Sequence, residues 1–398
     1  MAYRVLIYCP DQHILYEGST PDRRGAGGGI VARIRLAQAL ARRGHEVAIM
    51  GRVPRRHVHE GVTYLPLDER DLPAQVDVLV LTSSGGALTL EPARDLPVRA
   101  RLSEAWVHGT PPLGGLDELK PRYVVGVSNF VRRVMAEEWG LPAEQLFVIY
   151  NGATELPARH GLGGPPRRDP FGLIYASHPS KGLDAALGVL RRLRSRDPRY
   201  NLQVYGSNAL WGGKEDQPPR EDGVVTHGMV GQAEVIAGLQ RASFALHLQT
   251  RAEPFSLALL DALHYGALPI ASPVGGHLEL IEDGANGFLV PGDPSGGEVQ
   301  QRAADRILSM NAVPAFQDYL RRRAQALSWT WERQARVWEG HWAQALGEGG
   351  AMPEVPLRAD GCPLCGGDWL YLADGYHCAR CGFYEPHAQA VAQGAGLA

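Results

Sequence analysis

The chain has 398 residues, of which 44% are hydrophobic and 21% are charged, and its formal net charge is −3. This length fits two or three domains, and this composition excludes a wholly disordered chain and a fibrous repeat. A net charge this close to zero excludes a global basic field that would attract nucleic acid or an acidic membrane. Lysine is rare, since only Lys120, Lys181 and Lys214 occur, so each lysine is a candidate functional residue.

The first 150 residues alternate between segments of strand type and segments of helical periodicity. Apolar side chains at helical spacing predict helices at residues 30–43, which Gly44 ends, and at residues 129–138. Short apolar runs predict strands at residues 3–8, 46–50, 76–81, 105–108, 123–128 and 146–150. Strands that alternate with helices favour a parallel sheet covered on both faces.

A second α/β unit follows a linker. Residues 159–170 are rich in glycine and proline and lack apolar periodicity. After them we predict strands at residues 172–175, 201–205, 245–248 and 268–271, helices at 182–195, 232–240 and 256–265, and helical structure throughout 299–342. The predicted domains are residues 1–158 and 170–346, followed by a second linker at 347–361.

No stretch of the chain approaches the roughly 20 apolar residues of a membrane span. The first ten residues begin a strand and lack the apolar core and cleavage site of a signal peptide. We therefore expect a cytoplasmic protein without a transmembrane segment, either free or peripheral at the membrane.

Three segments carry residue types suited to binding an anion. A glycine run at residues 25–29 opens a helix, but it comes too long after the first strand for a dinucleotide fingerprint. Lys181 stands in a strand-to-helix loop, where its charge can neutralise a phosphate. Glu253 and Asp261 are eight residues apart, which places both acids on one face of a helix. Taken singly, a flexible loop, a solvated lysine and an ordinary buried helix explain the same segments.

Together these segments resemble the retaining GT-B glycosyltransferases, specifically glycosyltransferase family 4. The resemblance covers residues 3–345 and follows the order and spacing of that family. It rests on the glycine run before LAQALARRGHEV, on VGVSNFVRRVMAEEWGLPAEQLFVIYNGA, on KGLD, on the E-x7-D segment and on GG, EL and DGANGFLV. The resemblance implies two Rossmann-like domains that face a cleft, with the nucleotide sugar held mainly by the second. It also implies that SWTWERQARVWEGHW crosses back onto the first domain.

The resemblance also implies roles for individual residues of this sequence. Lys181 corresponds to a lysine that binds the donor diphosphate, Glu253 to a glutamate against the donor sugar and His108 to a histidine near that sugar, so these three are the candidate catalytic residues. The other candidate donor-binding residues are Gly28 and Gly29 in a loop that closes on the diphosphate, Phe255, Ser256 and Leu257 as backbone donors, and Asp261 at the ribose hydroxyls.

The chain departs from the family pattern at two positions. Asp261 stands where the family has a glutamate and is shorter by one methylene group. Ala176 stands where the family usually has an arginine, five residues before Lys181, so one cation on the diphosphate is missing or comes from elsewhere, and Arg251 is a candidate. The loops at residues 207–213 and 227–231 are expected to select the sugar and the base, although no residue type in them is diagnostic.

The implied activity is that of a retaining hexosyltransferase that uses a UDP-, GDP- or ADP-sugar and no catalytic metal. The expected acceptor is a hydroxyl group of a glycan or glycoconjugate. Two alternatives stay open: a glycosyltransferase that acts on modified bases of nucleic acid, and a non-catalytic binding protein that has kept the fold. A hydrolase with two catalytic carboxylates is disfavoured, because the two acids accompany phosphate-binding features.

Four cysteines near the end of the sequence have the spacing of a zinc ribbon, C-x2-C-x12-C-x2-C. They are Cys362, Cys365, Cys378 and Cys381. Four thiolates fill a tetrahedral shell, so the predicted zinc is structural and the predicted ribbon covers residues 362–385, with a disordered tail at 386–398. Residues 347–398 carry six acids and two arginines, which favours docking of a protein or the acceptor over nucleic acid, without excluding the latter.

Overall fold

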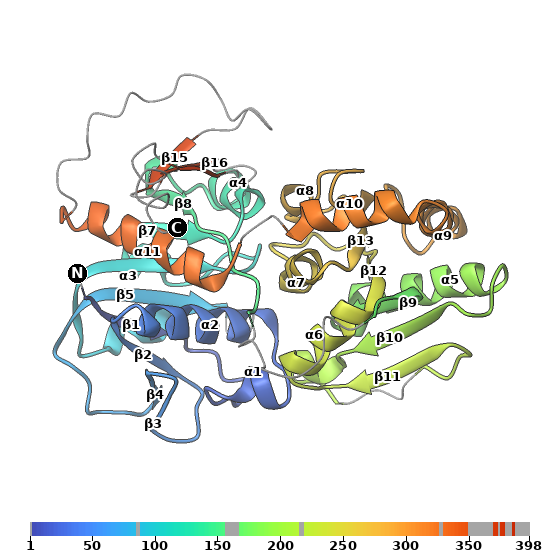
Figure 1. Cartoon of the computed structure of the whole chain (residues 1–398). Coiled ribbons are helices and arrows are strands. Elements are labelled where there is room, and N and C mark those ends of the chain that lie inside the picture. The colour runs from blue at the N-terminus through green and yellow to red at the C-terminus, as the bar shows by residue number, and fades with distance from the viewer. Residues whose placement is uncertain are drawn as a thin grey trace, which may run out of the picture.

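The computed structural model describes residues 2–84, 88–155, 167–214, 219–325 and 329–348, and it gives the backbone alone for residues 369–372, 375–378 and 384–386. Two α/β units lie side by side, each built around its own sheet (Figure 1). The predicted alternation of strands and helices is confirmed in both units.

The first unit contains a sheet of order β3-β4-β2-β1-β5-β6-β7-β8, in which all neighbours are parallel except β3 and β4. Its central strands are nearly continuous apolar runs, because helices cover both faces of a parallel sheet. The strands are β1 (Arg4–Tyr8), β2 (Glu46–Gly51), β3 (His57–His59), β4 (Val62–Pro66), β5 (Gln75–Ser83), β6 (Arg99–Val107), β7 (Tyr123–Gly126) and β8 (Leu146–Val148). The helices are α1 (Thr20–Arg23), α2 (Gly28–Arg42), α3 (Leu116–Leu119) and α4 (Asn129–Glu137).

The second unit contains an all-parallel sheet of order β11-β10-β9-β12-β13-β14. The strands are β9 (Asp169–Ala176), β10 (Asn201–Tyr205), β11 (Val224–Gly228), β12 (Ala242–His247), β13 (Leu268–Ala271) and β14 (Phe288–Leu289). The helices are α5 (Leu183–Arg194), α6 (Gln232–Arg241), α7 (Leu257–Tyr265), α8 (His277–Leu280), α9 (Gly297–Asn311) and α10 (Pro314–Gln325).

Helix α11 (Trp331–Ala345) returns to the first unit, as Figure 1 shows. There it packs against α2. Trp338 of α11 meets Trp106 of β6 edge-on, with ring centroids 5.5 Å apart. His341 Nε2 lies 2.5 Å from the fully buried carboxylate of Glu104. The helix that follows the second unit in sequence therefore belongs to the core of the first.

The two connections between the units run side by side. Ala153, on the first connection, donates its N–H to the carbonyl oxygen of Trp329, on the second, at 2.6 Å. Ala153 also forms an isolated parallel bridge with Thr330. The described parts of the two connections therefore meet at Ala153.

The prediction of helical structure throughout residues 299–342 is wrong, because the chain breaks there into α9, α10 and α11. Pro314 begins α10. It cannot donate a backbone hydrogen bond, and it disfavours helical geometry in the residue before it. In the part of the chain that the structure describes, no helix is long and apolar enough to cross a bilayer.

Short strands were the main elements that the sequence did not predict. The hairpin of β3 and β4 has a turn at Glu60 and Gly61, both with positive φ, and β3 is too short and too polar to show a strand pattern. β11 and β14 were also missed, and β9 begins at Asp169, inside the segment predicted as a linker. Residues 159–166 of that segment lie outside the described residues.

Near the end of the chain, β15 (Trp369–Leu372), β16 (Gly375–Cys378) and β17 (Tyr384–Pro386) form an antiparallel three-stranded sheet. The predicted zinc ligands Cys362, Cys365 and Cys381 lie outside the described residues, and Cys378 is described by its backbone alone. Residues 349–361 of the predicted linker and 387–398 of the predicted tail also lie outside the described part.

Candidate functional site

A cavity of about 200 Å³ lies between the two units, at the carboxyl ends of the strands of the second sheet. Ligands of open α/β sheets bind at this edge. The first unit contributes the glycine run to the lining, and the second contributes loops and the start of α7. The residues discussed below that line the cavity are Gly28, Ala176, His178, Lys181, Trp211, Gln232, Glu253, Phe255, Ser256, Leu257 and Asp261.

Lys181 and Glu253 form an ion pair in this cavity. Lys181 ends a 3-10 turn, Pro179–Lys181, that follows β9, and its Nζ lies 2.7 Å from Glu253 Oε2. The next residue, Gly182, has φ of +108°, and a Cβ there would lie 1.8 Å from a backbone carbonyl oxygen. Glycine at this position therefore lets the lysine loop approach the chain that leads to Glu253.

Glu253 is only 6% exposed, yet its carboxylate is ionised. Burial raises the pKa of Glu253, but the charge of Lys181 and hydrogen bonds from Lys181 and Gln249 outweigh burial, and the net pKa is lowered. The prediction that Glu253 lies on a helix with Asp261 is wrong. Helix α7 begins at Leu257, and Glu253 comes from the loop before it. Both acids nevertheless line the cavity.

Two helix N-termini, one from each unit, line the same cavity. Ser256 caps α7, and its Oγ accepts a hydrogen bond from Leu259 N at 3.2 Å. Gly28 begins α2, and a Cβ on Gly28 would lie 3.6 Å from Leu257 Cδ1. The first N–H groups of a helix have no acceptor within the helix and carry partial positive charge. The arrangement therefore suits an anionic ligand.

Asp261 of α7 is held at the connection between the units. Its Oδ1 accepts a hydrogen bond from Thr154 N at 2.8 Å, and Thr154 Oγ1 accepts one from Gln232 at 2.8 Å. Burial raises the pKa of Asp261 to about 7, although the Thr154 N–H opposes this shift. The carboxyl group therefore exchanges its proton near neutral pH.

His108 and Gly29 are not part of the cavity lining. A Cβ on Gly29 would lie 2.1 Å from Ser84 Cβ, so this glycine is needed for packing inside the first unit. His108 follows β6, and its Nε2 is buried without a hydrogen-bond partner among the described residues. Burial, reinforced by the charge of Arg33, lowers the pKa of His108 to about 3. His108 is therefore neutral at neutral pH.

Trp211 is a cavity residue that the sequence did not single out. Its side chain is 41% exposed, and its ring stacks on His178 with centroids 3.7 Å apart. Lys181 Nζ and the guanidinium carbon of Arg251 lie 5.7 and 5.4 Å from the centre of the indole. The sequence indicated the loop at residues 207–213, but no local pattern predicted that Trp211 stacks on His178.

Glu279 connects the second unit to the first. This residue of α8 accepts hydrogen bonds from Asn129 N and Phe130 N, at the start of α4, at 2.9 and 2.7 Å. It also accepts one from Tyr150 Oη at 2.8 Å. Glu279 belongs to the EL segment, but no local pattern predicts its role, because its partners lie about 130 to 150 residues earlier.

A second, larger pocket lies at the opposite edge of the first sheet, at the starts of β1, β2, β5 and β6. Four of its five charged residues pair with one another, since Arg4 pairs with Glu46 at 2.9 Å and Arg101 pairs with Asp77 at 3.1 Å, which leaves Arg99 as the one unpaired charge among the described lining residues. The amino edge of a parallel sheet is not where such folds bind ligands. The cavity between the units is therefore the candidate site.

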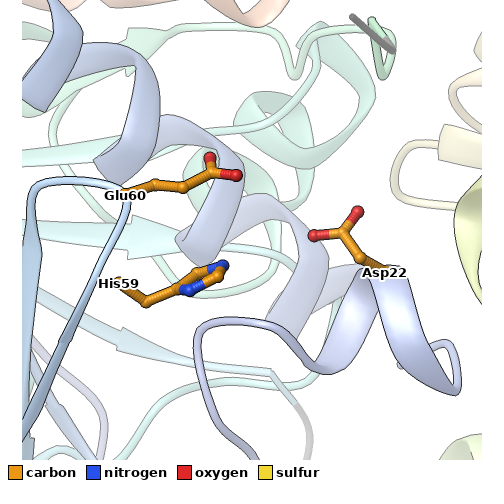
Figure 2. Close-up of side chains that lie close together, drawn as sticks. All are labelled: Asp22, His59 and Glu60. Atoms are coloured by element: carbon orange, nitrogen blue, oxygen red, sulfur yellow. The ribbon is translucent and has the colours of Figure 1, made fainter. Parts of the chain in front are cut away.

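One group of potential metal ligands, Asp22, His59 and Glu60, lies on the first unit (Figure 2). Their ligand atoms lie within 4.8 Å of one another. Asp22 already pairs with Arg35, whose Nη1 donates to Asp22 Oδ2 at 3.3 Å. Asp22 and Glu60 are both exposed. The charge of Asp22 is thus neutralised within the protein, and we assign no metal to this group.

The second unit is similar in sequence to known glycosyltransferases. Residues 171–304 match the family model of glycosyl transferases group 1. A glycogen synthase from Bordetella bronchiseptica is 33% identical over 139 residues, which are 32% of this chain and 27% of that protein. The chain spans between 27% and 48% of the length of the curated relatives it matches.

The whole arrangement of the two units matches solved structures of glycosyltransferases. A glycosyltransferase from Rickettsia africae matches with a TM-score of 0.62 at 14% identity, over 87% of this chain and 99% of that one. Anabaena HepE in complex with UDP-glucose matches with a TM-score of 0.56 at 16% identity, over 86% and 99%. At sequence identities this low, the similarity to these structures shows the fold alone. The chain therefore has the GT-B-like fold of glycosyltransferases, and its residues 171–304 are similar to glycosyl transferases group 1.

Proposed function

We propose that this chain is a retaining glycosyltransferase of family 4 that moves a hexose from a nucleotide sugar to a hydroxyl group of a glycan or glycoconjugate. The observation that carries the proposal is the convergence of Lys181 and the N-termini of α2 and α7 on one cavity. A lysine and two helix starts are suited to a diphosphate. The family match of residues 171–304 and the UDP-glucose bound by HepE support a nucleotide-sugar donor.

The donor is bound mainly by the second unit. Asp261 accepts hydrogen bonds from the ribose hydroxyls, and the N–H groups of residues 255–257 donate to the phosphate and the sugar. The glycine run covers the diphosphate from the first unit through Gly28, which lines the cavity, while the neighbouring Gly29 packs inside that unit and holds the run in place. Glu253, which is ionised and held by Lys181, accepts hydrogen bonds from hydroxyls of the donor sugar. His108 is neutral and is the proposed hydrogen-bonding group near that sugar, although it does not line the cavity in this structure.

The reaction breaks the bond between the anomeric carbon and the diphosphate oxygen while the acceptor oxygen bonds to that carbon. The acceptor attacks from the face on which the diphosphate leaves, so the anomeric configuration is retained. The acceptor proton passes to the leaving phosphate oxygen. Lys181 and the start of α7 stabilise the negative charge that develops on the leaving group. None of these steps requires a divalent metal.

The test is a turnover assay with UDP-, GDP- and ADP-hexoses, in which release of the nucleoside diphosphate is measured and the product anomer is assigned by NMR. The proposal expects release with one nucleotide, a product with the donor configuration, and a loss of orders of magnitude in Lys181→Met. Release at the wild-type rate by Lys181→Met, or an inverted product, overturns the proposed mechanism.

We also propose that residues 362–385 bind one structural zinc ion. The register of β15 and β16 supports this, because it pairs Trp369, four residues after Cys365, with Cys378. Cys378 therefore stands opposite a residue that follows Cys365 by four positions in the sequence, and four cysteine thiolates are the ligand set of a structural zinc ion. Elemental analysis is expected to give one zinc per chain, and Cys378→Ser is expected to lose it. A chain that holds no zinc after purification without chelator contradicts this assignment.

A further inference from the structure

The cavity between the units suits an anionic ligand, but its side chains carry less positive charge than a diphosphate carries negative charge. Among the described residues that line it, Lys181 is the single cation, and Glu253 and Asp261 are acids. The charge of Lys181 is already matched by Glu253 at 2.7 Å. The two helix N-termini contribute about half a charge each. A diphosphate carries a negative charge on each phosphoryl group, so a further cation outside the lining would complete its neutralisation.

The side chain of Arg251 is placed to supply that charge. Arg251 lies in the loop before α7, two residues from Glu253, and is exposed. In the part of the chain that the structure describes, Arg251 has no carboxylate partner. Its guanidinium lies over the ring of Trp211, the same indole over which Lys181 Nζ lies. Both cations therefore border the cavity at one aromatic side chain.

Trp211 is itself held in place. Its ring stacks on His178 at an interplanar angle of 12°, and His178 begins the 3-10 turn that ends in Lys181. The Nδ1 of His178 accepts a hydrogen bond from Ser180 N at 3.2 Å, which fixes the imidazole in that turn. An indole fixed in this way attracts a guanidinium to its face. The stack thus fixes the indole whose centre lies 5.7 Å from Lys181 Nζ and 5.4 Å from the guanidinium carbon of Arg251 before any ligand arrives.

We infer that Arg251 is the second cation that binds the diphosphate of the donor, and that Trp211 is the residue that positions it. The inference rests on the proposed function, because it concerns the ligand proposed for the same cavity. Ala176 lines the cavity at the end of β9, and its methyl side chain supplies no charge to a ligand there. Arg251 approaches the same ligand from the loop that follows β12.

The test compares the binding of UDP, ADP and GDP with that of UMP, AMP and GMP by isothermal titration calorimetry. Arg251→Gln is expected to lower the affinity for the diphosphate that wild type binds by about tenfold or more, because a hydrogen bond to a charged group is lost. The matching monophosphate is expected to change much less. Arg251→Lys keeps the charge and is expected to retain most of the affinity. Trp211→Leu is expected to lower the preference for the diphosphate in the same direction.

Arg196→Gln is the matched control. Arg196 is an exposed arginine beyond the far end of α5, a helix of 12 residues and therefore about 18 Å long. An Arg251→Gln chain that binds the diphosphate as tightly as wild type overturns the inference and leaves the proposed function intact. An equal loss for monophosphate and diphosphate also overturns it. If wild type binds none of the three diphosphates, the proposed function fails and the inference fails with it.

Discussion

Glu253, which is 6% exposed, depends on Lys181 for its charge, since Lys181 Nζ lies 2.7 Å from its Oε2. Lys181→Met should leave a buried carboxylate without a counter-ion and lower the free energy of unfolding by about 3 kcal/mol. The double variant Lys181→Met with Glu253→Gln removes both charges and should recover most of that loss. Urea unfolding of the wild type, both single variants and the double variant measures the coupling. Additive losses in the double variant would show that the pair does not stabilise the fold.

The free energy of unfolding should depend on pH because of Asp261. The pKa of Asp261 is raised to about 7, so between about pH 4 and 7 the folded chain keeps a proton that the unfolded chain has lost. This group therefore lowers the free energy of unfolding as pH rises through that window. Asp261→Asn still accepts from Thr154 N but does not titrate. Its stability relative to wild type should grow from pH 5 to pH 8 in thermal unfolding, and a constant difference would refute the shift.

Donor binding should also depend on the proton of Asp261. In the proposed complex, ribose hydroxyls donate to the ionised carboxylate of Asp261, so binding should favour loss of its proton. The affinity of wild type for the nucleoside diphosphate should rise from pH 6 to pH 8. The phosphate groups of the ligand titrate in the same range, so Asp261→Asn is the control, because only the ligand titrates in that variant. Identical pH profiles of the affinity for the two proteins would contradict a contact between Asp261 and the ribose.

Two adjacent glycines should respond differently to a methyl group. A Cβ on Gly28 lies at an ordinary contact distance of 3.6 Å from Leu257, whereas one on Gly29 lies 2.1 Å from Ser84 Cβ. Gly29→Ala should therefore destabilise the fold by about 1–3 kcal/mol, as overpacking does. Gly28→Ala should leave stability unchanged and weaken binding of the diphosphate, because it adds bulk at the start of α2. Thermal unfolding and calorimetry separate the two effects, and equal stability of the two variants would contradict the packing at Gly29.

The start of α4 should depend on an acid from the other unit. Glu279→Ala removes the acceptor for the N–H groups of Asn129 and Phe130 and should cost about 1 kcal/mol, with faster hydrogen exchange at these two amides. Glu282→Ala is the control, since Glu282 makes an exposed pair with Arg323 at 3.3 Å and should change stability little. Equal effects of the two variants would mean that Glu279 does not stabilise the contact between the units.

The sequence predicts the alternation of strands and helices because the buried strands are short apolar runs and the longer helices have a 3.6-residue period. It fails for α9 and α10, where helical composition hides the break before Pro314. It also fails for Glu253, since an eight-residue spacing fits a helix as well as a loop that leads into one. Both failures arise because composition and spacing constrain local geometry only weakly.

The candidate site was only partly predictable, for a different reason. Lys181 and Glu253 stand in loops and Asp261 stands on α7, and all three were predicted because their order and spacing resemble a family pattern. The contact of Thr154 with Asp261 joins residues 107 positions apart, and no local pattern encodes it. The stack of Trp211 on His178 is also a tertiary contact and was missed for that reason.

The most direct test of the central claim is a crystal structure of the chain with the nucleoside diphosphate that binds it. The account predicts the diphosphate between Gly28 and Lys181, at the start of α7, with the ribose hydroxyls on Asp261. A nucleotide bound elsewhere, for example in the pocket at the starts of β1 and β6, or no nucleotide in crystals grown at saturating concentration, would contradict it.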